Sequence, residues 1–149
     1  MKIKKLIISI LIPLLLGIIV SLFINTDIYD VIIKPEISPP KIVFPIVWTI
    51  LYILMGISNY IINKGNKKEV PNLIYYISLA INLIWPIIFF NAQEYLISLL
   101  IIIILIIFVA LTIIEYFKIS KIAGYLQVPY IIWLLFALYL NYQVLILNG

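Results

Sequence analysis

Five long apolar segments alternate with polar segments along this chain. Each is about 20 residues long, the length that an α-helix needs to cross the roughly 30 Å hydrocarbon core of a bilayer. Their hydrophobicity is continuous, whereas the strands of a membrane barrel would alternate. We therefore expect one all-α domain of five transmembrane helices, at about residues 6–24, 41–62, 71–91, 95–117 and 122–147, with a long polar loop at 25–40.

Aromatic and amide side chains recur at helical spacing in the second and third segments. Steps of four, three and four residues place them on one face of each helix. The two sets are Trp48, Tyr52, Met55 and Asn59, and Ser78, Asn82, Trp85 and Phe89. Isoleucines fill the opposite side of the second segment, as is typical of a lipid-facing surface. We expect the two aromatic faces to line a cavity.

The last segment carries a third aromatic stripe, which we expect to form another wall of that cavity. Its members are Tyr125, Pro129, Trp133, Phe136 and Leu140. In the third segment, Pro86 has no N–H to offer the carbonyl of Asn82, so a kink is expected beside that amide. On this interpretation Trp48 and Trp133 meet across the cavity.

Small residues recur every four positions in the first segment, at Ser9, Pro13, Gly17 and Ser21. Such a stripe lets another helix approach closely, either within the chain or in a dimer. The lysines before this segment resemble the start of a signal peptide. The apolar stretch is longer than in a signal peptide and no small-residue cleavage site follows, so an uncleaved helix is expected.

Composition supports a membrane protein, since 66% of the residues are hydrophobic and 11% are charged. Soluble domains average about 45–50% apolar residues. Cysteine and histidine are absent, which excludes disulfides, thiolate nucleophiles and metal sites built from these residues. We expect the lipid bilayer as a partner, no nucleic acid, no bound metal and no cofactor.

All ten basic residues are lysines, and their distribution predicts the orientation. Eight lie before the first segment, between the second and third, or between the fourth and fifth. Only Lys34 and Lys41 fall on the other side. Because cytoplasmic loops are enriched in basic residues, the N-terminus is expected in the cytoplasm and the C-terminus outside.

Three stretches resemble the TspO/MBR family of tryptophan-rich sensory proteins and translocator proteins. They read PPKIVFPIVWTILYILMG, LAINLIWPIIFF and PYIIWLLFALYLN. The resemblance extends over the whole chain. It implies a five-helix bundle whose ligand pocket is capped by the first loop, and a protein that binds tetrapyrroles such as protoporphyrin IX and other lipophilic small molecules.

The resemblance also implies the ligand-binding residues. By position in the motifs they are Trp48, Tyr52, Asn82, Phe89, Phe90, Trp133 and Ala137. A porphyrin carries two propionates, for which Lys34 and Lys41 at the first-loop end are candidate contacts. The lack of histidine and cysteine favours metal-free protoporphyrin IX over haem as the ligand.

Two departures from the family pattern narrow the function. No basic residue follows Lys121, which argues against the cholesterol motif of animal members. The chain has only three tryptophans, which argues against photochemistry that relies on several indoles. A binding protein or sensor is the favoured function. The alternatives are light- and oxygen-dependent breakdown of porphyrin, in which Trp48 and Trp133 would act, and transport of porphyrin or another lipophilic ligand. By resemblance alone we expect a homodimer, and the simple N-terminus favours a bacterial plasma membrane.

Overall fold

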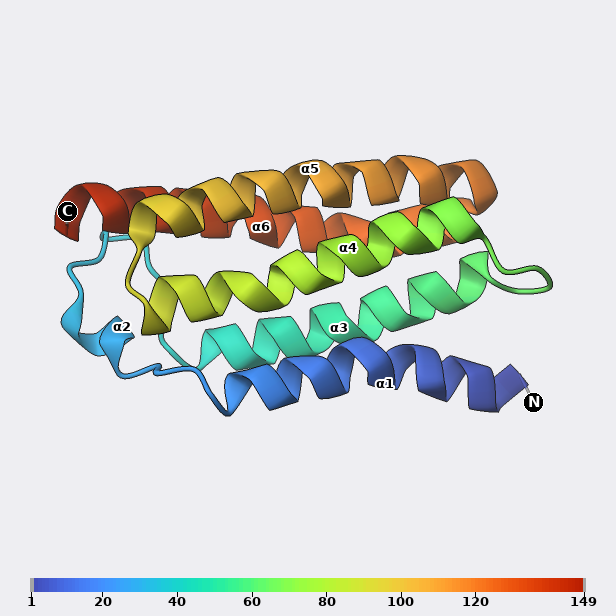
Figure 1. The fold of residues 1–149 in the computed structure, drawn as a ribbon, viewed down its shortest axis with the longest axis horizontal. Coiled ribbons are helices and arrows are strands. Elements are labelled where there is room, and N and C mark those ends of the chain that lie inside the picture. The colour runs from blue at the N-terminus through green and yellow to red at the C-terminus, as the bar shows by residue number, and fades with distance from the viewer. Residues whose placement is uncertain (1, 149) are drawn as a thin grey trace.

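The computed structural model describes residues 2–148, which form an all-α bundle (Figure 1). Five long helices run side by side, and each is long and apolar enough to span a membrane. This confirms the predicted fold class. In chain order the elements are α1 (Lys2–Ser21), α2 (Ile28–Val31), α3 (Val43–Ile62), α4 (Glu69–Pro86), the π-helix η1 (Ile87–Asn91), α5 (Tyr95–Ile119) and α6 (Lys121–Asn148).

The helix ends differ from the predicted ones by a few residues. The first helix starts at Lys2 and stops at Ser21, where two successive turns, Phe23 N–H to the Val20 carbonyl and Ile24 N–H to the Ser21 carbonyl, redirect the chain. α3 begins two residues later than expected, because the Pro40 carbonyl accepts the Val43 N–H in a turn before the helix. These shifts leave the order of the five spans as predicted.

Pro86 changes the helix type and not merely its direction. Because proline lacks an N–H, the regular α-helical ladder is interrupted there, and residues Ile87–Asn91 continue as one wide π-helical turn. Such turns shift the register of the side chains that follow. Phe89 and Phe90, although adjacent in sequence, are both buried in the bundle.

The first helix packs closely against α3 at two glycines. A Cβ atom on Gly56 would lie 2.4 Å from the Ile10 Cα, and the Ser9 hydroxyl donates a 2.6 Å hydrogen bond to the Gly56 carbonyl. A Cβ on Gly17 would lie 2.3 Å from the Tyr52 ring. The small-residue stripe of the first helix is therefore used within the chain.

The two ends of the bundle carry different charges. Figure 1 shows the N-terminus, the α3–α4 turn and the α5–α6 turn at one end, and α2 with the C-terminus at the other. Eight lysines belong to the first end, whereas Lys34 and Lys41 belong to the second. The structure thus places the lysines as two groups on opposite ends of the spans.

The buried faces of the second and third spans are those predicted. Tyr52, Met55 and Asn59 are buried on α3, as are Asn82 and Trp85 on α4. On the opposite side of α3, Ile46 and Ile50 are more than half exposed. The polar and aromatic residues on these helices therefore indicated the interior correctly.

The predicted face of α6 is wrong over most of its length. Tyr125 is 65% exposed and Pro129 also lies on the outer surface, whereas Leu140 of the same stripe is buried. The rest of the interior is formed by a set offset by one to two residues, namely Ala123, Gly124, Gln127, Tyr130, Leu134, Ala137, Asn141 and Val144. Large apolar side chains lie on every side of this helix, so their periodicity gave no reliable direction, whereas the amides Gln127 and Asn141 do lie on the interior face.

Two polar side chains in the bundle interior lack protein partners. The hydroxyl of Tyr75 and both amide atoms of Gln127 are buried and make no hydrogen bond within residues 2–148. An unpaired buried polar group costs about 1–3 kcal/mol. By contrast, Asn59, Asn72 and Tyr116 nearby satisfy one another with bonds of 2.8 and 2.9 Å.

Gly56→Ala is expected to lower the free energy of unfolding by about 1–3 kcal/mol, the usual cost of overpacking a close contact. The added methyl group meets helix backbone, which cannot rotate away. Denaturant unfolding of the purified protein in detergent measures the change. Ile46→Ala, on the exposed side of the same helix, should shift it by less than about 0.5 kcal/mol. Equal effects of the two substitutions would contradict the close α1–α3 packing.

Gln127→Met should raise the free energy of unfolding by about 1–3 kcal/mol, because it keeps the side-chain length and removes the unpaired amide. The same unfolding assay applies, with Gln143→Met, at a partly exposed position of the same helix, as the control. If Gln127→Met destabilises the protein, the amide is hydrogen-bonded to a group outside the chain.

Candidate functional site

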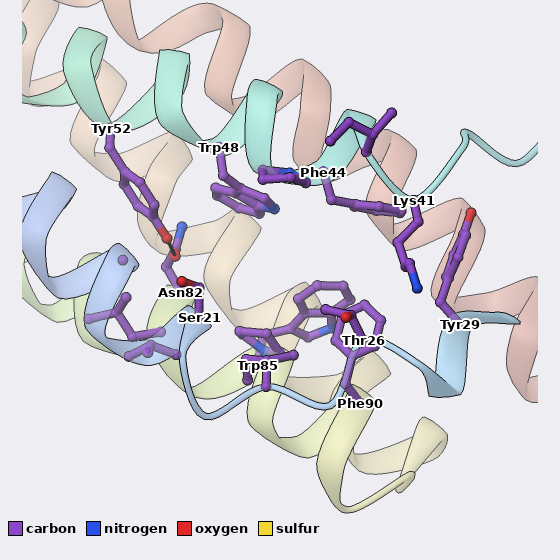
Figure 2. Close-up of a pocket in the computed structure, with 17 residues that line it drawn as sticks. Ser21, Thr26, Tyr29, Lys41, Phe44, Trp48, Tyr52, Asn82, Trp85 and Phe90 are labelled. Carbon is purple, nitrogen blue, oxygen red and sulfur yellow. Dashed lines mark hydrogen bonds between the residues drawn. The ribbon is translucent and has the colours of Figure 1, made fainter.

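A cavity of about 400 Å³ lies between α1, α3 and α4, in the half of the bundle nearest α2 (Figure 2). Helix α3 contributes one wall through Phe44, Trp48 and Tyr52, and α4 contributes another. Most of the lining is apolar. The residues around it are Gly17, Val20, Ser21, Ile24, Thr26, Tyr29, Lys41, Ile42, Phe44, Pro45, Trp48, Tyr52, Asn82, Leu83, Trp85, Pro86 and Phe90.

Aromatic rings form two facing sides of this cavity. Figure 2 shows Trp48 on one side of the open centre and Trp85 with Phe90 on the other. Trp48 stacks on Tyr52, with ring centroids 5.6 Å apart. Trp85 is held by a 2.9 Å hydrogen bond from its indole nitrogen to the Asn141 side-chain oxygen. Both indoles therefore have fixed positions along the cavity.

A single amide connects three helices at the inner end of the cavity. The Tyr52 hydroxyl donates a 2.8 Å hydrogen bond to Asn82 Oδ1, and Asn82 Nδ2 donates a 2.6 Å bond to the Tyr130 hydroxyl. All three side chains are buried. Gly17 of α1 leaves the space that the Tyr52 ring occupies. These two hydrogen bonds fix the orientation of the Tyr52 ring, on which Trp48 stacks.

The segment 25–40 closes the end of the cavity nearest α2, and several hydrogen bonds tie it down. Asn91 Oδ1 accepts the Asn25 N–H at 2.7 Å. Asn148 at the end of α6 pairs with the backbone of Ile33, accepting at 2.8 Å and donating at 2.7 Å. The Tyr29 hydroxyl donates to the Pro39 carbonyl at 2.6 Å. The loop is thus attached to η1, to α6 and to itself.

Lys41 supplies a cation at the exposed rim of the cavity. Its Nζ lies 2.8 Å from Asp30 Oδ2 and 3.7 Å from Asp27 Oδ1. The hydrogen bond with Asp30 raises the pKa of Lys41 above its usual value, so the ammonium stays charged at neutral pH. Burial raises the pKa of the neighbouring Tyr29 hydroxyl, which stays neutral.

Five of the residues expected at the site line this cavity, namely Trp48, Tyr52, Asn82, Phe90 and Lys41. The other four lie elsewhere. Phe89 is buried behind the lining and stacks on Trp85, with centroids 5.0 Å apart. Ala137 is buried on α6, and Lys34 donates a hydrogen bond to the Tyr29 carbonyl.

Trp133 is the fourth, and the expectation that it meets Trp48 across the cavity is wrong. It lines a separate groove between α3 and α6 and contacts Phe44, with ring centroids 5.9 Å apart. The rotation of α6 explains why Trp133 is absent from the cavity. Tyr130 takes the interior position instead and packs edge-on against Trp48, with ring centroids 6.2 Å apart. Trp133 Nε1 is buried and has no hydrogen-bond partner within residues 2–148.

Sequence reasoning missed Phe44 and Tyr130 as parts of the site. A signal existed for Phe44, since it precedes Trp48 by four residues and so shares its helix face. Trp85 was expected on the cavity wall from its helix face, although the family resemblance did not add it to the ligand-binding residues. Nothing in the sequence singled out Tyr130, because its role depends on the partner that it finds in Asn82.

The arrangement suits a flat lipophilic molecule that carries an acidic group. Ring faces of Trp48 and Trp85 provide stacking surfaces, and such contacts add about 0.5–1.5 kcal/mol per aromatic pair beyond burial. Lys41 at the rim can pair with a ligand carboxylate where that group displaces Asp30 or Asp27. The volume falls within the range of about 300–1,000 Å³ that is usual for small-molecule sites.

The family profile and the related proteins found by sequence comparison agree with one another. The sequence profile of the TspO/MBR family matches residues 9–147. The chain is 41% identical to the tryptophan-rich protein TspO of Chlorobaculum tepidum, over 80% of this chain and 78% of the relative. It is 38% identical to the tryptophan-rich protein TspO of Archaeoglobus fulgidus over the whole of both chains.

A more distant relative is the human translocator protein, which is 35% identical over 74% of this chain and 69% of its own length. The family profile covers nearly the entire chain, including the helices that build the cavity. With five apolar spans in an all-α bundle, the chain is a multi-pass membrane protein that belongs to the TspO/MBR family.

Proposed function

We propose that this protein is a membrane-embedded binding protein or sensor for hydrophobic tetrapyrroles such as protoporphyrin IX. The observation that carries the proposal is the pair of aromatic cavity walls with a lysine at the rim. Trp48 and Trp85 face a common space, into which one edge of a flat macrocycle fits. Lys41 is then the residue that pairs with a propionate, in exchange for one of its present partners, Asp30 or Asp27.

The names of the relatives support a ligand-dependent role. A relative from Cereibacter sphaeroides, 34% identical over 80% of this chain, is named a tryptophan-rich sensory protein. A sensor needs a site whose occupancy changes the protein. In this chain the loop over the cavity is attached to both η1 and α6, so a ligand that displaces the loop would alter contacts at two helices.

We also propose that the lysine-rich end of the bundle faces the cytoplasm of a bacterial cell and that the α2 end faces outward. Eight of the ten lysines support this orientation under the positive-inside rule. The cavity would then open toward the outer half of the bilayer.

Trp48→Leu is expected to weaken binding of protoporphyrin IX about two- to twelvefold, the loss of one stacking partner. Saturable quenching of tryptophan fluorescence in detergent solution measures the dissociation constant. Tyr142→Leu removes an aromatic ring from the exposed surface of α6 and should leave the constant unchanged. An absence of saturable quenching in the unmodified protein would refute the proposal.

Illumination of the same complex tests the alternative of light-driven breakdown. A binding protein leaves the porphyrin absorbance decaying at the same rate in the unmodified protein and in Trp48→Leu, once both are saturated. A decay that is faster only in the unmodified protein would assign the indole a redox role.

The orientation can be checked by cysteine labelling, because the chain has no cysteine of its own. Ile37→Cys, at an exposed position of the loop, should react with a membrane-impermeant maleimide in intact cells. Asn66→Cys, in the α3–α4 turn, should react only after permeabilisation. The reverse pattern would invert the proposed topology.

A further inference from the structure

Two aromatic rings separate the inner cavity from a groove on the outer surface. The groove has a volume of about 360 Å³ and lies between α3 and α6. Val47, Leu51 and Trp133 line it, whereas Phe44 lines the cavity. Phe44 and Trp133 are in direct edge contact, with ring planes inclined by 70°. These two rings therefore join the lining of the cavity to the lining of the groove.

The groove opens on the surface that faces lipid. Ile50 and Ile132 on its borders are 52% and 61% exposed, and its lining is almost entirely apolar. Both residues lie within transmembrane helices. A molecule dissolved in the hydrocarbon region can therefore reach the groove without passing the polar loop.

Phe44 is placed so that it can move. It lies in the first turn of α3, whose start has no side-chain cap. Its ring is held by edge contacts with Tyr29 of α2, at 5.1 Å, and with Phe90 of η1, at 6.5 Å. Edge contacts between rings are individually weak. Movement of the loop that carries Tyr29 would therefore remove one of the contacts that keep Phe44 in place.

Trp133 contributes an unused hydrogen-bond donor at this position. Its buried Nε1 has no acceptor among the described residues. Indole N–H groups that are buried usually have a partner. A lipophilic molecule that carries a carbonyl or carboxyl oxygen would supply one as it passes the ring.

We propose that Phe44 and Trp133 form a lateral gate through which a lipophilic ligand with an oxygen acceptor enters the cavity from the bilayer. The ligand first occupies the α3–α6 groove and passes when the Phe44 ring turns aside. That movement also uncovers Trp133 Nε1, which is buried in the closed structure and can then donate a hydrogen bond to the passing ligand. This inference rests on the proposed binding function. It gives Trp133 a role on the ligand path, although that residue does not line the closed cavity.

Val47→Phe and Ile132→Phe test the gate, because each fills the groove from a different helix. The protein is reconstituted in phosphatidylcholine vesicles and mixed with a second set of vesicles that carry protoporphyrin IX. Stopped-flow quenching of tryptophan fluorescence gives the association and dissociation rates. Both variants should lower both rates at least tenfold and leave the dissociation constant within twofold.

Ile46→Phe is the matched control, since Ile46 is exposed on α3 and lines neither the groove nor the cavity. Its rates should equal those of the unmodified protein. Unchanged rates in both groove variants, with saturable binding retained, would overturn the gate and leave the binding function intact. Faster exchange in Asn148→Ala alone would place the entrance at the loop. Loss of saturable binding in the unmodified protein would remove both proposals.

Discussion

The hydrogen-bonded chain through Asn82 is the interaction on which the interior of this bundle depends. Three helices meet there, because the amide accepts from Tyr52 on α3 and donates to Tyr130 on α6. In a bilayer no water is present to replace a lost bond, and an unsatisfied polar group costs several kcal/mol. The hydrogen bonds through Asn82 therefore fix the relative rotation of α3, α4 and α6 at the inner end of the cavity.

The rest of the site is built outward from that point. Tyr52 supports Trp48 by stacking, and the space for the Tyr52 ring exists because α1 has a glycine at position 17. On the other side, the π-helical turn after Pro86 directs Phe89 against Trp85 and Phe90 into the cavity. Side chains held by packing and hydrogen bonds thus surround the cavity on the sides away from the loop.

The loop joins this rigid interior to the surface. The side chains of Asn91 and Asn148 hold it by accepting hydrogen bonds from its backbone, and Tyr29 extends from it to the ring of Phe44. Displacement of the loop and movement of the ring are consequently linked.

The sequence by itself determined the number and order of the spans, the separation of the lysines, and the interior faces of α3 and α4. Those faces could be predicted because asparagine and serine carry polar groups that are costly in lipid and therefore mark the interior. The tertiary structure alone decided which tryptophans share the cavity. Lipid and bundle interior are both apolar, so the stripe of large apolar side chains on α6 could not distinguish them. The rotation of α6 follows instead its polar contacts, Tyr130 with Asn82 and Asn141 with Trp85.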